Sequence, residues 1–248
     1  MIKAILLDLD NTLVLFDETA FYLRYMERIM PYFADIVPQE TFRDRLLRGI
    51  RGLAQNDGSR PNSHHFMDIF CENLDGSRAV IWDRFMAFYT TEYDQIPVAV
   101  ELPAGLMSII DQLDAWQLRL VVATNPLFPK IAQEKRMAWA GLEPARFELL
   151  THLENMSFVK PRAGYYHQIC DRIGLPPHQC LMVGNDAVND MVAGTVGMKT
   201  YLTTEAGKID YGAVTKGRNV RRGESHTADF SGPLAGVPAA VAQLRREM

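Results

Sequence analysis

The stretch Ile2-Lys3-Ala4-Ile5-Leu6-Leu7-Asp8-Leu9-Asp10-Asn11-Thr12-Leu13 decides how the rest of the chain is interpreted. An uninterrupted apolar run leads into two acids separated by one residue, which predicts a buried strand with carboxylates at its carboxyl end. The acids face one side if the strand continues through both, whereas a turn after Asp8 aims them differently. Two carboxylates this close repel each other unless a cation lies nearby or one takes up a proton. The pair therefore indicates metal binding or acid–base chemistry, and a solvated turn is the alternative.

The 248-residue chain has an ordinary soluble globular composition, with 48% hydrophobic and 23% charged residues. That length can bury a substantial core, as one large domain or two modest ones. The formal net charge of -4 provides no overall attraction to nucleic acid or to an anionic membrane, so we expect neither as a partner. We expect a cytoplasmic protein, because the amino terminus lacks the features of a secretion signal and no apolar run reaches membrane-spanning length. The oligomeric state is left open.

Four helix-like stretches and hardly any strand signal occupy residues 17–96. Apolar residues at helical spacing predict a first helix over 17–36, and Pro38 fits the first turn of a second helix. A loop is predicted at 56–63, followed by helices around 65–74 and over 77–93. The spacing of the aromatic residues favours core packing over a binding cavity. This section is predicted to be a small helical bundle.

Helices and strands alternate after residue 101. Alternation predicts a parallel sheet with helices on both faces, and the first strand, residues 3–7, belongs to the same sheet. The predicted strands are 118–123, 148–151, 180–183 and 199–202, and the predicted helices are 106–116, 128–140, 162–173, 186–196 and one within 231–246. Residues 1–15 and 98–248 therefore form an α/β core, and residues 16–97 form an inserted helical domain.

Ligands of open parallel sheets bind beyond the carboxyl ends of the strands, so residues that follow strands are candidate site residues. The hydroxyl and amide of Thr124 and Asn125 suit hydrogen bonding to an oxyanion, although such residues also begin helices. Lys160, in a turn stiffened by Pro161, would neutralise a phosphate or carboxylate, and a solvated surface lysine is the alternative.

The last candidate group is Val183-Gly184-Asn185-Asp186-Ala187-Val188-Asn189-Asp190. Its two acids at i, i+4 spacing are predicted to share one helix face. Hard oxygen ligands of this kind suit Mg²⁺, although Asp186 could instead cap a helix. All four groups fall at strand ends of one predicted sheet, which favours a shared site over four coincidences.

Taken in order, these groups resemble the four motifs of the haloacid dehalogenase-like (HAD) hydrolase superfamily. The matching residues are Asp8-Leu9-Asp10-Asn11-Thr12, Thr124-Asn125, Lys160-Pro161, and Gly184-Asn185-Asp186 with Asp190. The helical section also resembles the cap domain of that family. The resemblance implies a doubly wound parallel α/β sheet with an inserted all-helical cap at 16–97.

The resemblance further implies a Mg²⁺-dependent phosphatase acting on a small phosphorylated metabolite. Asp8 would be the nucleophile that becomes an aspartyl phosphate. Asp10 would protonate the leaving alcohol and then deprotonate the hydrolytic water. Thr124 and the backbone of Asn125 would hold phosphate oxygens, while Lys160 offsets charge and steers Asp8. Asp8, the backbone carbonyl of Asp10 and an acid of the last motif would bind the metal.

One residue departs from the family pattern: Asn185 stands where family members commonly carry an aspartate. We therefore expect Asp186 to bind the metal, with Asp190 binding directly or through water. A dehalogenase has no use for Asp10, whereas a phosphomutase keeps every catalytic group, and a non-catalytic binding or regulatory protein on this fold is a third alternative. Substrate choice should lie in the cap. The basic run 216–222 is expected to be solvated.

Overall fold

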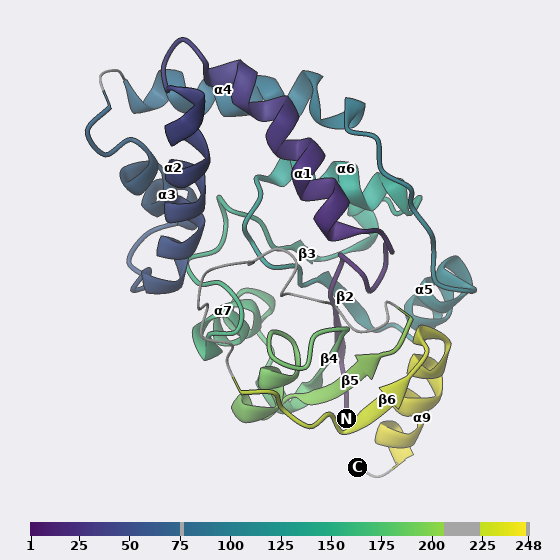
Figure 1. Cartoon of the computed structure of the whole chain (residues 1–248). Helices are drawn as coiled ribbons and strands as arrows, with labels where there is room; N and C mark the ends of the chain where they lie inside the picture. The colour runs from purple at the N-terminus through teal and green to yellow at the C-terminus, as the bar shows by residue number, and fades with distance from the viewer. Residues whose placement is uncertain (75–76, 206–223, 247–248) are drawn as a thin grey trace.

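A parallel six-stranded sheet lies at the centre of the computed structural model, which describes residues 1–74, 77–205 and 224–246 (Figure 1). The strand order is β3-β2-β1-β4-β5-β6. Every residue of β1 is buried, because an apolar strand in the middle of a parallel sheet has both faces covered. The strands are β1 (Ala4–Leu7), β2 (Arg119–Val122), β3 (Leu149–Leu150), β4 (Cys180–Gly184), β5 (Lys199–Thr203) and β6 (Phe230–Gly232).

The two faces of the sheet belong to two hydrophobic clusters. Ile5 and Leu7 pack in the cluster that contains α5 and α9, whereas Ala4 and Leu6 pack in the one that contains α7. This follows from the two-residue alternation of side chains along a strand. The sequence therefore correctly predicts a doubly wound α/β core. The helices of the core are α5 (Leu106–Ala115), α6 (Lys130–Trp139), α7 (Ala163–Ile173) and α9 (Val237–Arg246).

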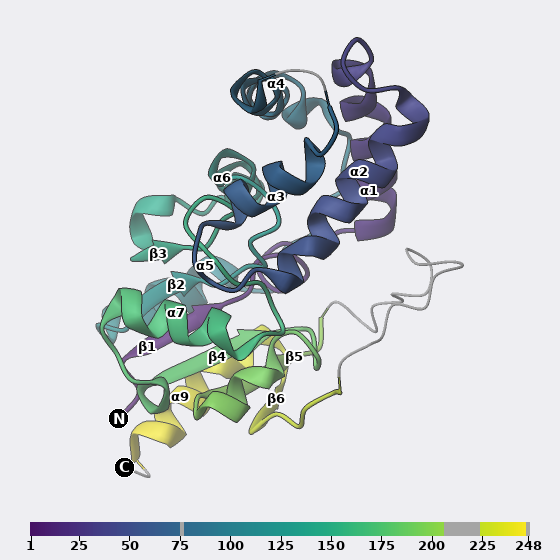
Figure 2. The ribbon, with the colours of Figure 1, turned by 90° about the vertical axis from the view of Figure 1, so that its left-hand side faces the viewer.

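Four of the five α-helices between β1 and β2 gather on one side of the sheet, with α6 beneath them (Figures 1 and 2). Aromatic side chains of this helical section are buried against one another, as in the pair Phe33 and Phe85, whose ring centroids lie 4.5 Å apart. The prediction that these rings form a core is confirmed. The helices are α1 (Glu18–Ile29), α2 (Gln39–Gly52), α3 (Asn62–Phe70) and α4 (Arg78–Thr91).

Several contacts join the helical section to the core, and two of them are formed by backbone hydrogen bonds. At the first contact, the segment that enters the helical section lies beside the segment that leaves it. Leu15 and Glu101 exchange two backbone hydrogen bonds of 2.9 Å there. We keep residues 16–97 as the proposed extent of the cap.

The second contact is a segment that we call the strap, residues 56–63, which lies against the core residues leading to Lys160. Asn62 donates its backbone N–H to Met156 at 2.7 Å and its side-chain N–H to the carbonyl of Phe158 at 3.2 Å. The amide of Asn56 donates to Asn62 at 2.9 Å, and both asparagines are fully buried. The strap thus holds the cap to the core through satisfied, buried polar groups.

Two helices of the cap differ from their predicted bounds. The first ends at Ile29 and is followed by a 3₁₀ helix, Met30–Phe33, so the prediction of a helix to residue 36 is wrong. The cause is Pro31, which has no N–H to donate and whose ring obstructs a continuing α-helix. The third begins at Asn62 instead of residue 65, directly after Pro61.

Two segments of the core also differ from prediction. Residues 186–190 form a hydrogen-bonded turn and only Met191–Val196 form a 3₁₀ helix, so the helix predicted over 186–196 is wrong. The side chain of Asp186 binds the backbone N–H groups of this turn, in competition with a helix. Residues 230–232 form the edge strand β6, which is too short to produce a periodic pattern.

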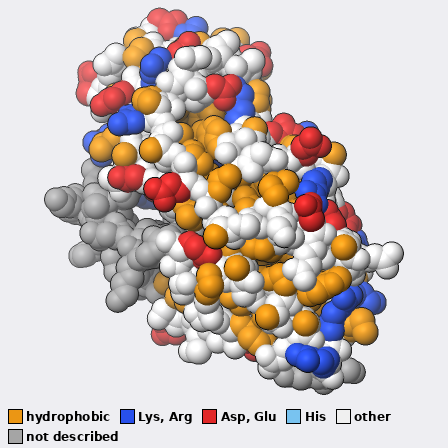
Figure 3. All heavy atoms as spheres, turned by 90° about the vertical axis from the view of Figure 1, so that its right-hand side faces the viewer, with side chains coloured by type: hydrophobic (Ala, Val, Ile, Leu, Met, Phe, Trp, Pro, Cys, Tyr) orange, Lys and Arg blue, Asp and Glu red, His pale blue; other side chains and the backbone are white. Residues whose placement is uncertain are grey.

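Within the described residues, every helix is too short or too polar to cross a membrane. On the face drawn in Figure 3, basic side chains lie among acidic and hydrophobic ones and form no continuous basic surface. The basic run 216–222 lies outside the described residues.

Candidate active site

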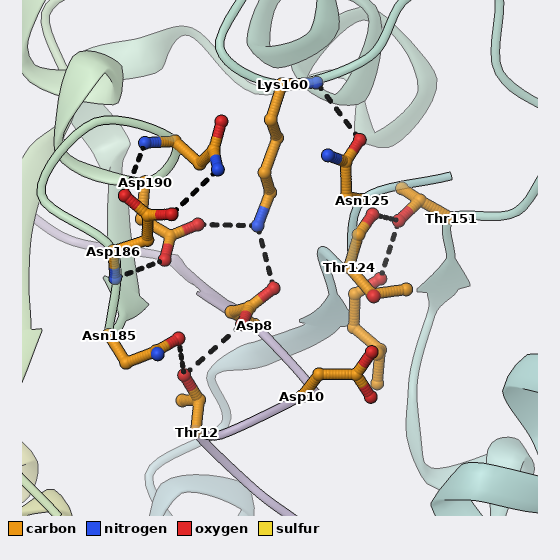
Figure 4. A network of polar contacts seen from close by, with 12 residues as sticks. Asp8, Asp10, Thr12, Thr124, Asn125, Thr151, Lys160, Asn185, Asp186 and Asp190 are labelled. Carbon is orange, nitrogen blue, oxygen red and sulfur yellow. Dashed lines mark hydrogen bonds and ion pairs between the residues drawn. The ribbon is translucent and has the colours of Figure 1, made fainter. Parts of the chain in front are cut away.

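The register of the central strands brings the candidate residues to one edge of the sheet. Leu7 pairs with Val122 on one side and with Val183 on the other, so the three strands end level. The N–H of Asp8 still donates to the carbonyl of Val183 at 2.9 Å, which fixes this residue at the end of β1. Figure 4 shows Asp8 at the centre of the resulting cluster.

Asp8 shares one lysine with a second acid. Lys160 Nζ donates to Asp8 Oδ1 at 2.8 Å and to Asp190 Oδ1 at 2.6 Å, and all three residues are buried. The other oxygen of Asp8 accepts from the hydroxyl of Thr12 at 3.3 Å. Direct contacts therefore join the motifs that carry Asp8, Lys160 and Asp190, which the sequence predicts to share one site.

The charges of this cluster are strongly coupled. Burial raises the pKa of Asp8 to about 8, an effect that Lys160 opposes and Asp190 reinforces. Burial acts against the charge of Lys160, but the two carboxylates outweigh it and raise the pKa of the lysine well above its ordinary value. The lysine therefore stays protonated, and two acidic side chains share its single charge. A further cation would stabilise the ionised form of Asp8.

Asp10 points away from Asp8 (Figure 4) and has a cation of its own. Its Oδ2 forms an ion pair with Arg136 of α6, whose side chain is only 1% exposed. Burial raises the pKa of Asp10, while Arg136 and Lys160 act in the opposite direction. Of the two arrangements that the sequence allows, the structure has the one in which the chain turns after Asp8.

The acids of the last motif are bound within their own turn. Asp186 Oδ1 accepts from the backbone N–H groups of Val188 and Asn189 at 2.8 and 3.0 Å, and Oδ2 accepts from the Asn189 amide at 2.7 Å. Asp190 Oδ2 accepts from the N–H of Asp186 at 3.0 Å. Gly184 is required here, because a methyl group on it would overlap the Asp190 carboxylate. Both acids therefore have protein partners.

Asn185, which belongs to the last motif, lies near Asp8 (Figure 4). Its Oδ1 lies 3.2 Å from the hydroxyl of Thr12, which also contacts Asp8. Its Nδ2 is buried, with no hydrogen-bond partner among the residues that the structure describes. Two hard oxygens, one from Asp8 and one from Asn185, thus flank one hydroxyl.

In the described part of the chain, no group of three or more His, Cys, Asp and Glu residues is arranged to hold a metal. The ligand set Asp8, Asp10, Asp186 and Asp190 therefore stays a prediction. The oxygens beside Thr12 fit a hard cation that keeps several waters and takes one or two carboxylates.

The residues after β2 lie on the opposite side of Asp8. Thr124 is 2% exposed, and its carbonyl accepts from Thr151 Oγ1 at 2.7 Å and from the Tyr165 hydroxyl at 2.9 Å. The side chain of Asn125 accepts from the backbone N–H of Lys160 at 3.2 Å. Asn125 therefore links two of the motif loops, and phosphate binding by this pair stays a prediction.

Sequence reasoning missed Arg136 and Glu18. Glu18 begins α1, and its Oε1 accepts from the Asn11 amide at 2.7 Å, while burial raises its pKa to about 7. A usable signal for Arg136 was present, because it shares a predicted helix face with Ala132 and Met137. A basic residue on a face expected to be buried indicates a specific partner.

Comparison with known proteins decides the family. The model of haloacid dehalogenase-like hydrolases matches residues 2–196. The chain belongs to this family. It is 39% identical over 154 residues to haloacid dehalogenase-like hydrolase domain-containing protein 3 from Xenopus laevis, a match covering 61% of this chain and 60% of that protein.

Solved structures of other HAD-like proteins share the fold. A 2-haloacid dehalogenase from Pseudomonas syringae aligns with a TM-score of 0.63 at 18% identity, covering 98% of this chain and 100% of that chain. A predicted phosphoglycolate phosphatase from Haemophilus somnus aligns with a TM-score of 0.55 at 17% identity, covering 97% and 98%. A HAD hydrolase from Bacillus subtilis bound to magnesium gives 0.53 at 19% identity, covering 97% and 98%. The chain, a member of the HAD-like hydrolase family, therefore has a fold that serves more than one reaction.

Proposed function

We propose that this HAD-like hydrolase is a Mg²⁺-dependent phosphatase that hydrolyses a small phosphomonoester through an aspartyl phosphate on Asp8. The observation that carries the proposal is the division between the two acids. Asp8 contacts Lys160, whereas Asp10 has a separate cation and keeps one oxygen without a hydrogen-bond partner among the described residues. Two-step phosphoryl transfer uses a nucleophilic carboxylate and a distinct acid–base group.

The same division separates this proposal from haloacid dehalogenation. A departing halide needs no proton, so a dehalogenase has no use for Asp10. The cluster is also rich in acids, so an anionic substrate needs a cation beside it. The charged groups of the site are Asp8, Asp10, Asp186 and Asp190 with Lys160 and Arg136.

We propose that Asp8 and Asn185 hold Mg²⁺ together with the backbone carbonyl of Asp10. Asp186 would join only if its carboxylate left the N–H groups of its own turn. A HAD relative bound to magnesium supports the choice of metal. When bound, Mg²⁺ would neutralise charge on the phosphate oxygens.

Residues of this chain would supply the remaining requirements. Lys160 orients Asp8 and favours its charged form. The Thr124 hydroxyl and the Asn125 N–H would bind phosphate oxygens. The cap would exclude water while the aspartyl phosphate forms, and its cover over the site suits a small metabolite.

Phosphate release from 4-nitrophenyl phosphate tests the proposal. With Mg²⁺, we expect wild type to release phosphate and Asp8→Asn to be slower by more than about 1,000-fold. The matched control is Asp35→Asn, which removes an exposed acid of the cap that pairs with Arg84. Equal rates for wild type and Asp8→Asn would exclude Asp8 as the nucleophile.

Two further readouts separate the alternatives. Chloride release from 2-chloropropionate would indicate a dehalogenase, and we expect none. Phosphorus NMR of a sugar phosphate reaction distinguishes inorganic phosphate, the expected product, from an isomeric sugar phosphate, the product of a phosphomutase.

A further inference from the structure

Arg136 has no role in the reaction as described so far, yet it is the buried cation beside Asp10. Its side chain is 1% exposed. A buried charge is unfavourable unless it is paired and hydrogen-bonded, so its presence calls for a specific reason.

The guanidinium is held from several directions. Nε donates to the Tyr93 hydroxyl at 2.7 Å, and NH1 donates to Asp10 Oδ2. The rings of Phe128 and Phe21 lie 4.1 and 4.9 Å from its central carbon. These contacts fix the plane and the direction of the group, as cation–π and hydrogen-bond geometry require.

Arg136 contacts only half of the Asp10 carboxylate. A guanidinium commonly binds both oxygens of a carboxylate through two parallel N–H groups. Here, among the described residues, Asp10 Oδ1 and Arg136 NH2 are buried without a hydrogen-bond partner. One oxygen of Asp10 is therefore fixed, and the other remains available.

We propose that Arg136 is the positioning residue for Asp10, fixing Oδ2 so that Oδ1 is the oxygen that exchanges protons with the substrate and with water. This inference rests on the proposed function. When Asp8 bonds to phosphorus, the bond from phosphorus to the leaving oxygen breaks, and that oxygen takes the proton from Oδ1. When water then bonds to phosphorus, the bond to Asp8 breaks and the water proton moves to Oδ1. Arg136 stabilises the carboxylate that exists between the two transfers.

The cap takes part in this arrangement. Phe21 of α1 and Tyr93, which follows α4, supply the ring and the hydroxyl that orient Arg136 of the core. Asp10 is therefore oriented only when these cap residues are packed against α6.

The dependence on the leaving group tests this role. Nitrophenolate departs without a proton, whereas the alkoxide of benzyl phosphate needs one, so loss of the acid slows benzyl phosphate selectively. We expect Arg136→Met to reduce kcat/KM about 100-fold more for benzyl phosphate than for 4-nitrophenyl phosphate. Arg136→Lys, which keeps the charge, should lie between Arg136→Met and wild type.

The ratio of the two rates is measured on one protein sample, so it is independent of the fraction that folds. The control is Arg146→Met, which removes an arginine paired with Asp111 and Asp114 on α5 and should leave the ratio unchanged. An equal fall on both substrates for the Arg136 variants overturns the inference.

Asp10→Asn distinguishes the two possible failures. If Asp10→Asn changes the ratio and the Arg136 variants do not, the positioning role alone is wrong. If Asp10→Asn leaves the ratio unchanged, Asp10 is not the acid, and the proposed function fails with the inference.

Discussion

Asp8 and Asp10 are two residues apart, yet their surroundings differ in almost every respect. Asp8 shares Lys160 with Asp190, so two acids contact one cation. Asp10 is paired with Arg136, which is packed among aromatic rings. The first arrangement leaves negative charge for a cation to balance, and the second is balanced within the protein. Neighbouring carboxylates can therefore serve different roles when the chain turns between them.

Replacing Lys160, which Asp8 and Asp190 share, should have the largest effect among the substitutions that test this comparison. Lys160→Met leaves Asp8 and Asp190 buried without their common cation. We expect a loss of about 3–5 kcal/mol in the free energy of unfolding and a fall in phosphate release of at least about 100-fold. Urea unfolding and the 4-nitrophenyl phosphate assay measure the two effects.

The control for this prediction is Lys199→Met, which removes a half-exposed lysine paired with Asp229. We expect a change of less than about 1 kcal/mol, because exposed ion pairs contribute little. Similar stability losses for both variants would show that the burial of Lys160 does not increase the loss caused by removing it.

A substitution beside Asp8, Asn185→Asp, tests how this side of the site binds Mg²⁺. Asn185→Asp places a carboxylate where the amide oxygen now faces Thr12 and Asp8. We expect the Mg²⁺ concentration for half-maximal activity to fall about tenfold, because a charged oxygen binds the cation more tightly. Activity titrations with Mg²⁺ measure this shift.

Asp186→Asn provides the counterpart. If Asp186 is the ligand, as the sequence predicts, this variant raises the Mg²⁺ requirement and Asn185→Asp leaves it unchanged. That result would contradict the ligand set proposed from the geometry.

The smallest expected effect is a change in the free energy of unfolding that tests whether the surroundings of Asp8 and of Asp10 are independent. Thr12→Val removes a hydroxyl beside Asp8, and Tyr93→Phe removes the hydroxyl that accepts from Arg136. Each should reduce the free energy of unfolding by about 1 kcal/mol. Because the two hydroxyls share no partner, the double variant should show the sum within about 0.5 kcal/mol. A larger deviation in urea unfolding would show that the two sides are coupled.

The sequence predicts what depends on local pattern. β1 is identified by its apolar run, and the strand ends place Asp8 and Thr124 near one another because parallel strands of similar length end together. Lys160 instead reaches Asp8 from the loop that follows β3. The family model matches residues 2–196, the span that contains these motifs.

Other features depend on contacts between distant residues. Asp10 and Arg136 are far apart in sequence, and their pairing depends on how the cap packs over α6, which no local pattern reveals. The turn at Asp186 was predicted as a helix because a capping side chain and a turn-closing side chain look alike in sequence.

The strap determines which segments must be transferred together when a chimera is made between HAD-like proteins. Asn62 and Ser63 bond to the backbone of Met156 and Leu153, in the segment that leads to Lys160. A cap grafted from a relative would bring a strap whose donors and acceptors match its own core. A functional chimera should therefore carry residues 153–158 together with residues 16–97, so that the new cap meets the segment with which its strap evolved.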